Sequence, residues 1–471
     1  MPATLAEELL TRAADPANYR RWVEQVTQVG YCEHPVRLLG QVEEADAETG
    51  EVCTTYASEN EPDGVTLKAC GNRRASRCQP CSEVYRRDAW HLIAAGLRGG
   101  KGVPAGVAAH PRLFVTFTAP SFGPVHSRRE RGGTVRPCHP RNPTARCQHG
   151  HPAACWRRHE DDDPCLGEPI CADCFDYEAA VLWNALALAL WRRTTIYLRR
   201  ALAHAVRLTP AELAAVVRVS YAKVAEYQRR GVVHFHALFR LDAADSHDGK
   251  PVEPPPSAFT VEILERAVRE AARRVAVRWP GVAGAAQWGE QLDIRRITTS
   301  ARPEDLSAEV VAAYIAKYAT KSTEALGALD RRLSATDIEH LDLSDHVMRL
   351  VRACWTLGGQ PAFAGLRLRR WAHQLGFGGH FLTKSRRYAT TLTALRQARA
   401  EHAIRARFHG EPCDAWGRPA SAGAVAILAR WRFAGRGYTT PTDAGLAAAM
   451  AEEARARRLV AREESRTAVC A

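Results

Sequence analysis

Two apolar stretches near the middle of the chain are interrupted by polar positions in the manner of β-strands. They occupy residues 216–228 and 232–241. Three residues ending in Gly231 separate them, and hairpin loops of this length often place glycine in a left-handed conformation. With such a loop Glu226 lies directly opposite His234, whereas a two-residue loop would turn it to the other face. The pattern therefore predicts an antiparallel hairpin whose register depends on its loop.

Further elements are expected on both sides of this hairpin. Strands are predicted at 113–118 and 288–297, and helices at 82–98, 177–203, 261–279 and 307–322. Helices interleaved with strands around an antiparallel hairpin predict the α+β class, in which a sheet packs against helices.

The length of the chain predicts more than one structural region. A chain of 471 residues is too long for a single compact core. A glycine-rich joint follows residue 98, and proline and cysteine gather between 138 and 174. We expect an N-terminal region at 1–105, a core at 106–324 that an insertion at 138–174 interrupts, and a mostly helical, basic C-terminal region at 325–471.

The predicted hairpin brings together a carboxylate and two imidazoles. Alternate residues of a strand share a face, so His234 and His236 point the same way and Glu226 joins them from the opposite strand. One carboxylate and two imidazoles leave coordination positions open, which suits Mg²⁺ or Mn²⁺ acting on a phosphate. The alternative is a pair of half-buried, hydrogen-bonded histidines without a metal. The carboxylate in the matching position favours the metal site.

The predicted helix at 307–322 carries a possible nucleophile. Tyr314 and Tyr318 are four residues apart and share one face, and Lys317 and Lys321 repeat that spacing beside them. A phenol has a reference pKa of about 10, so a neighbouring cation must assist it as a nucleophile. The alternative is an ordinary amphipathic helix whose tyrosines pack on the sheet.

Charge is distributed unevenly along the chain. The net charge is +13, yet residues 1–66 have 13 acidic and 4 basic side chains, a balance of −9 that leaves +22 for the remainder. A basic body of this kind suits contact with nucleic-acid phosphates. The first residues lack a basic start and an apolar signal core, and no apolar run reaches the length of a membrane span. We therefore expect a cytoplasmic protein without a membrane partner.

Eleven of the 14 cysteines lie between Cys32 and Cys174. In a cytosolic chain such clusters predict metal ligands and not disulfides. Cys70, Cys78 and Cys81 supply three thiolates, two of them in a Cys-x-x-Cys turn that points both sulfurs at one tetrahedral Zn²⁺. Cys32 is the expected fourth ligand, with Cys53 as the alternative.

A second group of cysteines and histidines fills the insertion. Cys171 and Cys174 form another Cys-x-x-Cys pair, and Cys147 and Cys155 are their expected partners. His149 and His159 leave room for a different donor set or for two ions. We expect one to three structural Zn²⁺ ions in all, which supply folding free energy where the apolar core is small.

These motifs together resemble the HUH endonucleases, which start rolling-circle replication. The stretch 112–120 resembles their first sheet motif, Glu226 with His234 and His236 resembles their metal motif, and Tyr314 to Lys321 resembles their two-tyrosine motif. The segments 70–81, 171–177 and 375–388 also resemble RepSA-type initiators of actinomycete plasmids and integrative conjugative elements.

The resemblance implies an activity. It implies an HUH-like antiparallel sheet and a nick in single-stranded or supercoiled origin DNA that leaves a 5′-phosphotyrosine and a 3′-OH primer. Host polymerase and host helicase are then expected partners. Two alternatives stay open: a relaxase or two-tyrosine transposase with the same chemistry on another DNA site, and a non-catalytic, zinc-dependent DNA-binding regulator.

Overall fold

The computed structural model describes residues 7, 10, 12–46, 49–244, 252–298, 305–320, 331–407 and 425–470. The chain divides into two compact units, one made of Met1–Asp88 with Thr391–Ala471 and the other of Ala89–Thr390. Among the described residues, no helix combines the length and the apolar character needed to cross a bilayer.

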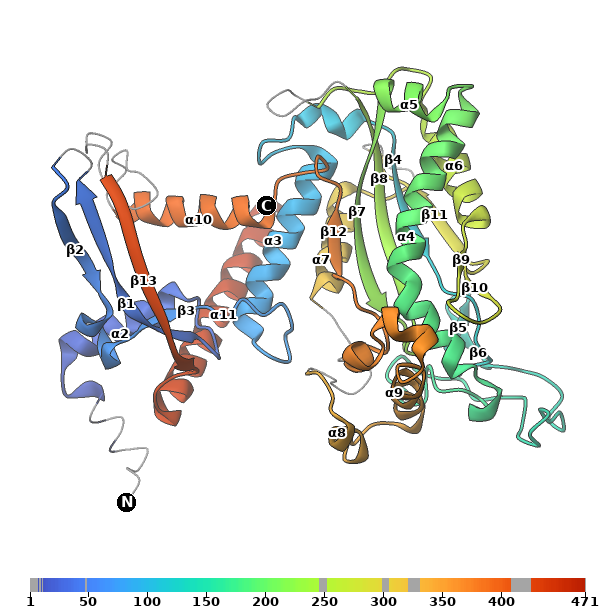
Figure 1. Ribbon diagram of the computed structural model, residues 1–471, viewed down its shortest axis with the longest axis horizontal. Helices are drawn as coiled ribbons and strands as arrows, with labels where there is room; N and C mark the ends of the chain where they lie inside the picture. The colour runs from blue at the N-terminus through green and yellow to red at the C-terminus, as the bar shows by residue number, and fades with distance from the viewer. Residues whose placement is uncertain are drawn as a thin grey trace. The chain divides into compact units, whose positions relative to one another are not determined.

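A five-stranded antiparallel sheet forms the centre of the unit Ala89–Thr390 (Figure 1). Its strand order is β11-β4-β8-β7-β12. The strands are β4 (Arg112–Phe117), β7 (Val217–Tyr227), β8 (Val233–Ala243), β11 (Leu292–Arg296) and β12 (Leu382–Lys384). The combination of helices with an antiparallel sheet confirms the mixed α and β class expected from the sequence.

Helices α4 (Tyr177–Ala205) and α6 (Val261–Arg274) cover one face of this sheet (Figure 1). Trp191 of α4 packs against Phe235 and Phe239 of β8, with ring centroids 5.9 and 5.8 Å apart. Aromatic contacts of this kind add to the free energy gained from burial. The alternation of β8 therefore directs its phenylalanines into the core and its histidines to the opposite face.

Helix α7 (Ala308–Ala319) packs against β7. The Ser307 side chain accepts a hydrogen bond from the Val310 amide at 3.3 Å and caps the helix. Val311 and Ile315 form its buried side. The expected tyrosine helix is thus confirmed over Ala308–Ala319 with Thr320 as its C-cap, and Lys321 lies outside the described residues.

The unit also contains further strands and α-helices. They are β5 (Arg129–Arg131), β6 (Thr134–Arg136), α5 (Pro210–Val216), β9 (Val277–Arg278), β10 (Ala285–Ala286), α8 (Ala335–Glu339) and α9 (Asp345–Leu357). Helix α3 (Gln79–Arg98) begins in one unit and ends in the other.

The unit that joins both ends of the chain contains a second antiparallel sheet of order β13-β1-β2, with β3 also paired to β1. Its strands are β1 (Val36–Asp46), β2 (Val52–Ala57), β3 (Thr66–Lys68) and β13 (Val425–Arg436), and its helices are α2 (Pro16–Gln28), α10 (Leu392–Arg407) and α11 (Pro441–Cys470). Trp22 and Val26 of α2 and Ala447 of α11 form a small core.

Strand β13 was not expected in a C-terminal region read as mostly helical. It pairs with β1 along its whole length, from Val36 opposite Arg436 to Asp46 opposite Val425. A strand gains its hydrogen bonds from a partner, and here that partner lies at the other end of the sequence. The alternation of Trp431 and Phe433 with Arg430 and Arg432 is a strand signal that the helical interpretation overlooked, whereas the pairing with β1 could not be read from local patterning.

Candidate functional site

The loop between β7 and β8 determines which residues face each other. The Gln228 amide donates a hydrogen bond to the Val232 carbonyl at 2.9 Å and closes a three-residue loop. Gly231 adopts a positive φ of 76°, as a loop of this kind requires. Glu226 consequently lies directly opposite His234. The register predicted from the sequence is confirmed.

Glu226, His234 and His236 converge on one point. One carboxylate oxygen, Oε2 of Glu226, lies 3.0 Å from Nε2 of His234 and 3.1 Å from Nε2 of His236. His236 is buried, whereas Glu226 and His234 are half-buried. Two of the three donors, Glu226 and His234, are therefore partly accessible to solvent.

Thr116 of β4 is a part of the site that the sequence did not reveal. Its hydroxyl lies 3.0 Å from Nδ1 of His236, and Thr116 is paired with His236 across the sheet. Asp293 of β11 stands next in the same row, opposite Thr116. A partner on Nδ1 orients the imidazole and directs Nε2 toward the carboxylate. A threonine in a buried strand carries no distinctive signal, so only the sheet pairing reveals this contact.

Burial and hydrogen bonding set the protonation states of the site. Burial acts to raise the pKa of Glu226, but hydrogen bonds with His234 and His236 outweigh it and hold that pKa below its ordinary value. Burial lowers the pKa of His236, with an opposing contribution from Glu226. An ionised carboxylate beside a neutral imidazole is the form in which these groups act as metal ligands.

Both tyrosines of α7 face His236. The Tyr314 hydroxyl lies 3.4 Å from Nε2 of His236, and the rings of Tyr314 and Tyr318 are 4.6 Å apart between centroids. The Tyr318 ring is 5.7 Å from that of His236. Lys317 places its ammonium 5.6 Å from the centre of the Tyr318 ring. The helix therefore brings the Tyr314 hydroxyl and the Tyr318 ring beside His236, with the Lys317 ammonium next to Tyr318.

The tyrosines need help to ionise. Burial raises the pKa of Tyr314, and Tyr318 and Glu226 raise it further. Burial and Glu226 also raise the pKa of Tyr318. A phenol with a raised pKa is a poor nucleophile at neutral pH unless a positive charge is bound nearby. A cation bound beside Glu226 would counteract the rise that this carboxylate causes in the pKa of both tyrosines.

Comparison with known proteins places the chain in a family. The RepSA family model, described as "Replication initiator protein, pSAM2", matches residues 18–452. The chain belongs to the RepSA family of replication initiators. A replication initiator protein of Streptomyces ambofaciens is 42% identical over 480 residues, which cover 99% of this chain and 96% of that relative. No solved structure gives a significant match.

This RepSA family member brings together the first group of cysteines predicted from the sequence. The sulfur atoms of Cys32, Cys70, Cys78 and Cys81 all lie within 4.8 Å of one another. Cys32 and Cys78 are 3.8 Å apart, and Cys70 and Cys81 are 3.7 Å apart. Four sulfurs at these distances match a closed tetrahedral site. Cys53, the alternative fourth ligand, is exposed on β2.

The second group differs from the expectation in one member. Cys147, Cys171 and Cys174 gather with His149, whose Nδ1 lies 3.3 Å from the Cys174 sulfur. Cys155, expected as the fourth ligand, is not in this cluster.

The backbone explains where Cys155 lies. The His139 amide donates to the Cys155 carbonyl at 2.7 Å, and the Cys155 amide donates to the His139 carbonyl at 2.9 Å. This bridge places Cys155 beside Cys138, in a third cluster with His126 and His159. Spacing along the chain does not reveal such a pairing.

Proposed function

We propose that this initiator nicks one strand of its origin DNA by tyrosine transesterification. One observation carries the proposal: the Tyr314 hydroxyl lies 3.4 Å from the same His236 nitrogen that faces the Glu226 carboxylate. The nucleophile comes from helix α7, and the carboxylate and imidazole donors come from strands β7 and β8 of the sheet against which that helix packs. The RepSA family membership supports an action on a replication origin.

The reaction exchanges one phosphoester for another. The phenol oxygen of Tyr314 or Tyr318 attacks the scissile phosphorus, and the bond from phosphorus to the 3′-oxygen breaks. The phenol proton is lost to solvent and the leaving oxygen takes up a proton, so the reaction needs no oxidant and no nucleoside triphosphate. The products are a 5′-phosphotyrosine and a 3′-OH, which would prime a host polymerase while a host helicase separates the strands.

The donor set fits a hard divalent cation. Glu226, His234 and His236 offer one ionised oxygen and two imidazole nitrogens from rigid strands, which leaves other positions for water and phosphate oxygens. When bound there, Mg²⁺ or Mn²⁺ would neutralise charge that develops on the phosphate. Thr116 keeps the His236 ring in the orientation that this requires.

Two tyrosines allow two cleavages. Since Tyr314 and Tyr318 both face His236, one can cut the parental strand and the other the newly made strand. Lys317 is placed to stabilise negative charge at Tyr318. We propose the same role for Lys321, which lies outside the described residues. The Cys32/Cys70/Cys78/Cys81 and Cys147/His149/Cys171/Cys174 clusters would hold structural Zn²⁺.

Phenylalanine substitutions test the proposal. The full chain is incubated with Mn²⁺ and a labelled single-stranded origin oligonucleotide, and the covalent adduct is resolved on a denaturing gel. We expect Tyr314→Phe and Tyr318→Phe to reduce the adduct and the double variant to abolish it. Tyr197→Phe, in α4 and away from the site, serves as the control and should retain it.

The same assay separates the alternatives. An adduct that persists in the double variant would overturn the tyrosine assignment. Binding of origin DNA without cleavage, unaffected by removal of Mg²⁺ or Mn²⁺, would instead support a non-catalytic regulator. Cleavage at the ends of the mobile element and not at its origin would support a transposase.

A further inference from the structure

Four side chains near the insertion form a compact cluster that the sequence did not assign. The donor atoms of His126, Cys138, Cys155 and His159 lie within 4.8 Å of one another. The Cys138 sulfur is 3.9 Å from His126 Nδ1, and the Cys155 sulfur is 3.5 Å from His159 Nε2. Tetrahedral Zn²⁺, with bonds of about 2.3 Å to sulfur and about 2.0 Å to nitrogen, holds such atoms about 3.5–3.8 Å apart. The spacing is that of a zinc site.

The surroundings of the cluster orient its donors. The Ser127 amide donates to the Cys138 sulfur at 3.2 Å. Nδ1 of His159 lies 2.8 Å from the Asp163 carboxylate, which leaves Nε2 directed at Cys155. A carboxylate behind a ligating histidine is a recurrent companion of zinc, because it fixes the tautomer and raises the basicity of the ring.

Free thiols and hydrogen-bonded histidines are the alternative to a metal. Between residues 126 and 174 the described chain has only β5, β6 and one three-residue 3-10 helix as regular structure. Yet Cys138, Cys155 and His159 are buried, with His159 fully inaccessible. Burying polar donors together costs free energy, and a segment with so small an apolar core offers little to offset that cost. A metal ion bound by the four donors would offset it.

The cluster is tied to the β7–β8 turn through His126. The His126 amide donates to the Glu168 carbonyl at 2.8 Å, and the Gly167 amide donates to the His126 carbonyl at 2.8 Å. Gly167, with a φ of +91°, packs so closely on Arg229 that an added Cβ would lie 2.4 Å from the Arg229 carbonyl carbon. The segment that is hydrogen-bonded to His126 therefore packs directly on the backbone of the turn.

A second route runs through His159. Asp163 contacts both the imidazole and the turn. Its carboxylate lies beside Nδ1 of His159, and its backbone carbonyl accepts a hydrogen bond from Arg229 Nη1 at 3.3 Å. Arg229 also donates to the carbonyl of Asp161. Both routes end on the same residue of the turn.

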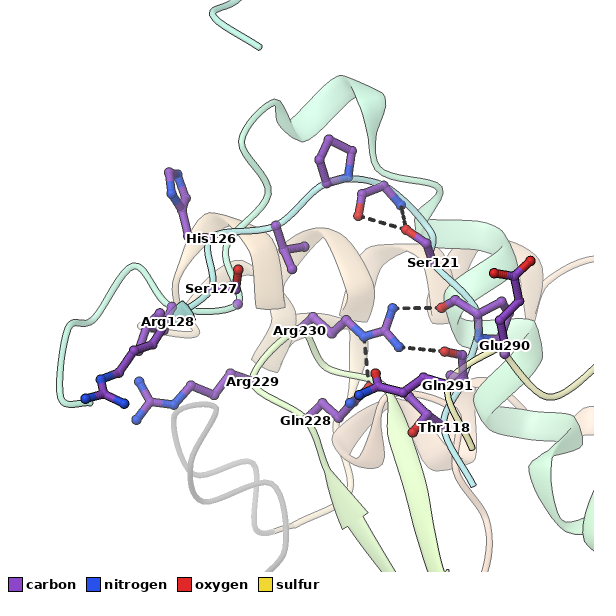
Figure 2. A pocket seen from close by; sticks show the side chains of 18 of the residues that line it. Thr118, Ser121, His126, Ser127, Arg128, Gln228, Arg229, Arg230, Glu290 and Gln291 are labelled. Atoms are coloured by element: carbon purple, nitrogen blue, oxygen red, sulfur yellow. Dashed lines mark hydrogen bonds between the residues drawn. The ribbon is translucent and has the colours of Figure 1, made fainter. Parts of the chain in front are cut away.

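The turn and the cluster border one pocket, shown in Figure 2. Its volume is about 1030 Å³, and His126, Arg128, Arg229 and Arg230 are among its lining residues. Arg230 reaches across to the carbonyl oxygens of the segment after β4, as the dashed lines in Figure 2 show. One wall thus comes from the cysteine-rich segment and the other from the hairpin.

We propose that His126, Cys138, Cys155 and His159 bind a Zn²⁺ ion, and that this ion holds the β7–β8 turn in place. Glu226 and His234 each stand two residues from the ends of that turn, so the ion buttresses the end of the hairpin that carries them. The proposal goes beyond the cleavage reaction, because it assigns a metal and a positioning role to residues that take no part in the chemistry.

Metal content tests the donor set. The full chain and its variants are purified, and bound zinc is measured by mass spectrometry. We expect Cys155→Ala to hold one zinc ion per chain fewer than the parent, and Cys155→His, which restores a ligand, to hold the parental amount. Unchanged zinc in a folded Cys155→Ala protein, or a loss in Cys155→His equal to that in Cys155→Ala, would overturn the assignment.

Two neighbours provide matched controls. The Cys165 sulfur lies 3.4 Å from Nδ1 of His159, the nitrogen that faces Asp163, and His139 Nδ1 lies 3.0 Å from the Cys138 sulfur. We expect Cys165→Ala and His139→Ala to keep the parental zinc and His126→Ala to lose one ion. Loss of zinc in either control, with retention in His126→Ala, would show that the donor set is wrong.

Hydrogen exchange tests the effect on the turn. In Cys155→Ala the amides of residues 228–232 should exchange about tenfold faster than in the parent, because local opening becomes easier. Residues 36–46, in the other unit, serve as the internal control. Loss of the ion without a change at 228–232 would refute the positioning role. Neither measurement involves DNA cleavage, so an inactive nuclease would leave both results intact.

Discussion

Two kinds of candidate metal site occur in this molecule, and they differ in how many donors they offer. The Glu226/His234/His236 site has three donors and an exposed side toward Tyr314, which is 37% exposed. The cysteine-rich clusters each have four donors. A site with three protein ligands keeps a position for substrate, whereas four ligands complete a tetrahedron and exclude it. The donor count therefore distinguishes the proposed catalytic site from the proposed structural sites.

The two kinds of site also rest on different frameworks. The three donors stand on neighbouring strands of a sheet, where the backbone ladder fixes their spacing. The cysteines of the insertion stand on loops with little regular structure. A strand scaffold positions a reacting group with or without a metal, whereas a loop scaffold depends on the metal for its shape. Loss of metal should therefore reduce activity but not stability at the three-donor site, and should reduce stability at the cysteine clusters.

The largest expected effect is on cleavage. Glu226→Gln replaces the ionised oxygen with a neutral amide, so we expect the rate of origin nicking to fall by more than about 100-fold. The melting temperature should stay near that of the parent, because the sheet keeps its hydrogen bonds. Nicking of supercoiled origin plasmid with Mn²⁺ and calorimetry measure the two quantities. Glu270→Gln, at a half-buried position of α6 where the side chain pairs with Arg274, is the control. A parental rate in Glu226→Gln would show that this carboxylate is not needed for cleavage.

The next effect is on stability at a closed cluster. Cys78→Ser removes one sulfur from the Cys32/Cys70/Cys78/Cys81 cluster. Structural zinc contributes on the order of 10 kcal/mol to folding, so we expect a loss of one ion and a melting temperature lower by about 10 °C or more. Calorimetry and zinc analysis measure both. Cys53→Ser, at an exposed position, should change neither, and a stable Cys78→Ser protein without zinc would contradict the structural role.

A third prediction concerns the sheet beneath the open site. Lys223 of β7 is buried, its ammonium lies 4.0 Å from the centre of the Phe235 ring, and it has no hydrogen-bond partner among the described residues. Burial lowers the pKa of Lys223 to about 7. The unfolded chain holds this proton up to about pH 10, so stability should rise from pH 7 to pH 10.

Lys223→Met should remove this penalty. Below pH 7 we expect the free energy of unfolding to increase by on the order of 3 kcal/mol, and the dependence on pH between 7 and 10 should become weaker. Urea denaturation at several pH values measures it. Arg266→Met in α6 is the matched control, since this side chain has no comparable burial. An unchanged pH profile would show that Lys223 does not titrate in this range.

The smallest expected effect is at the turn that fixes the register. An alanine at Gly231 would adopt a positive φ of 76° and bring its Cβ to 2.3 Å from a methyl group of Leu350. We expect a loss of about 1–3 kcal/mol of unfolding free energy, measured by urea denaturation. Gly133→Ala also has a positive φ but nothing within 4 Å, so it should lose less. Equal losses in the two variants would show that packing against Leu350 is unimportant.

The donors of the open site were predictable because they are set by counting along two adjacent strands. The loop length puts Glu226 opposite His234, and the alternation of a strand adds His236. The i, i+4 spacing likewise places Tyr314 and Tyr318 on one face of a helix. Thr116 escaped prediction, since its contact with His236 depends on the pairing of β4 with β8, and many residues separate these strands.

The closed clusters were predictable only where the motif is local. The Cys78-x-x-Cys81 turn and its partner Cys70 were recognised, and Cys32 was the expected fourth ligand that the structure brings to them. In the insertion, the cysteine count did not reveal which residues gather. The bridge between His139 and Cys155 decides that Cys155 leaves the Cys171/Cys174 pair. Several pairings satisfy the same spacing, and the backbone hydrogen bonds select one.

Two local elements of this RepSA initiator follow from periodicity within a few residues and were therefore predictable. They are the hairpin with its register and the helix with its two tyrosines. Tertiary structure alone decided that α7 faces His236, that β13 pairs with β1, and that His126 joins Cys138, Cys155 and His159. These contacts join distant segments. Their free energy depends on which surfaces the whole chain can bury together, and that cannot be counted along the sequence.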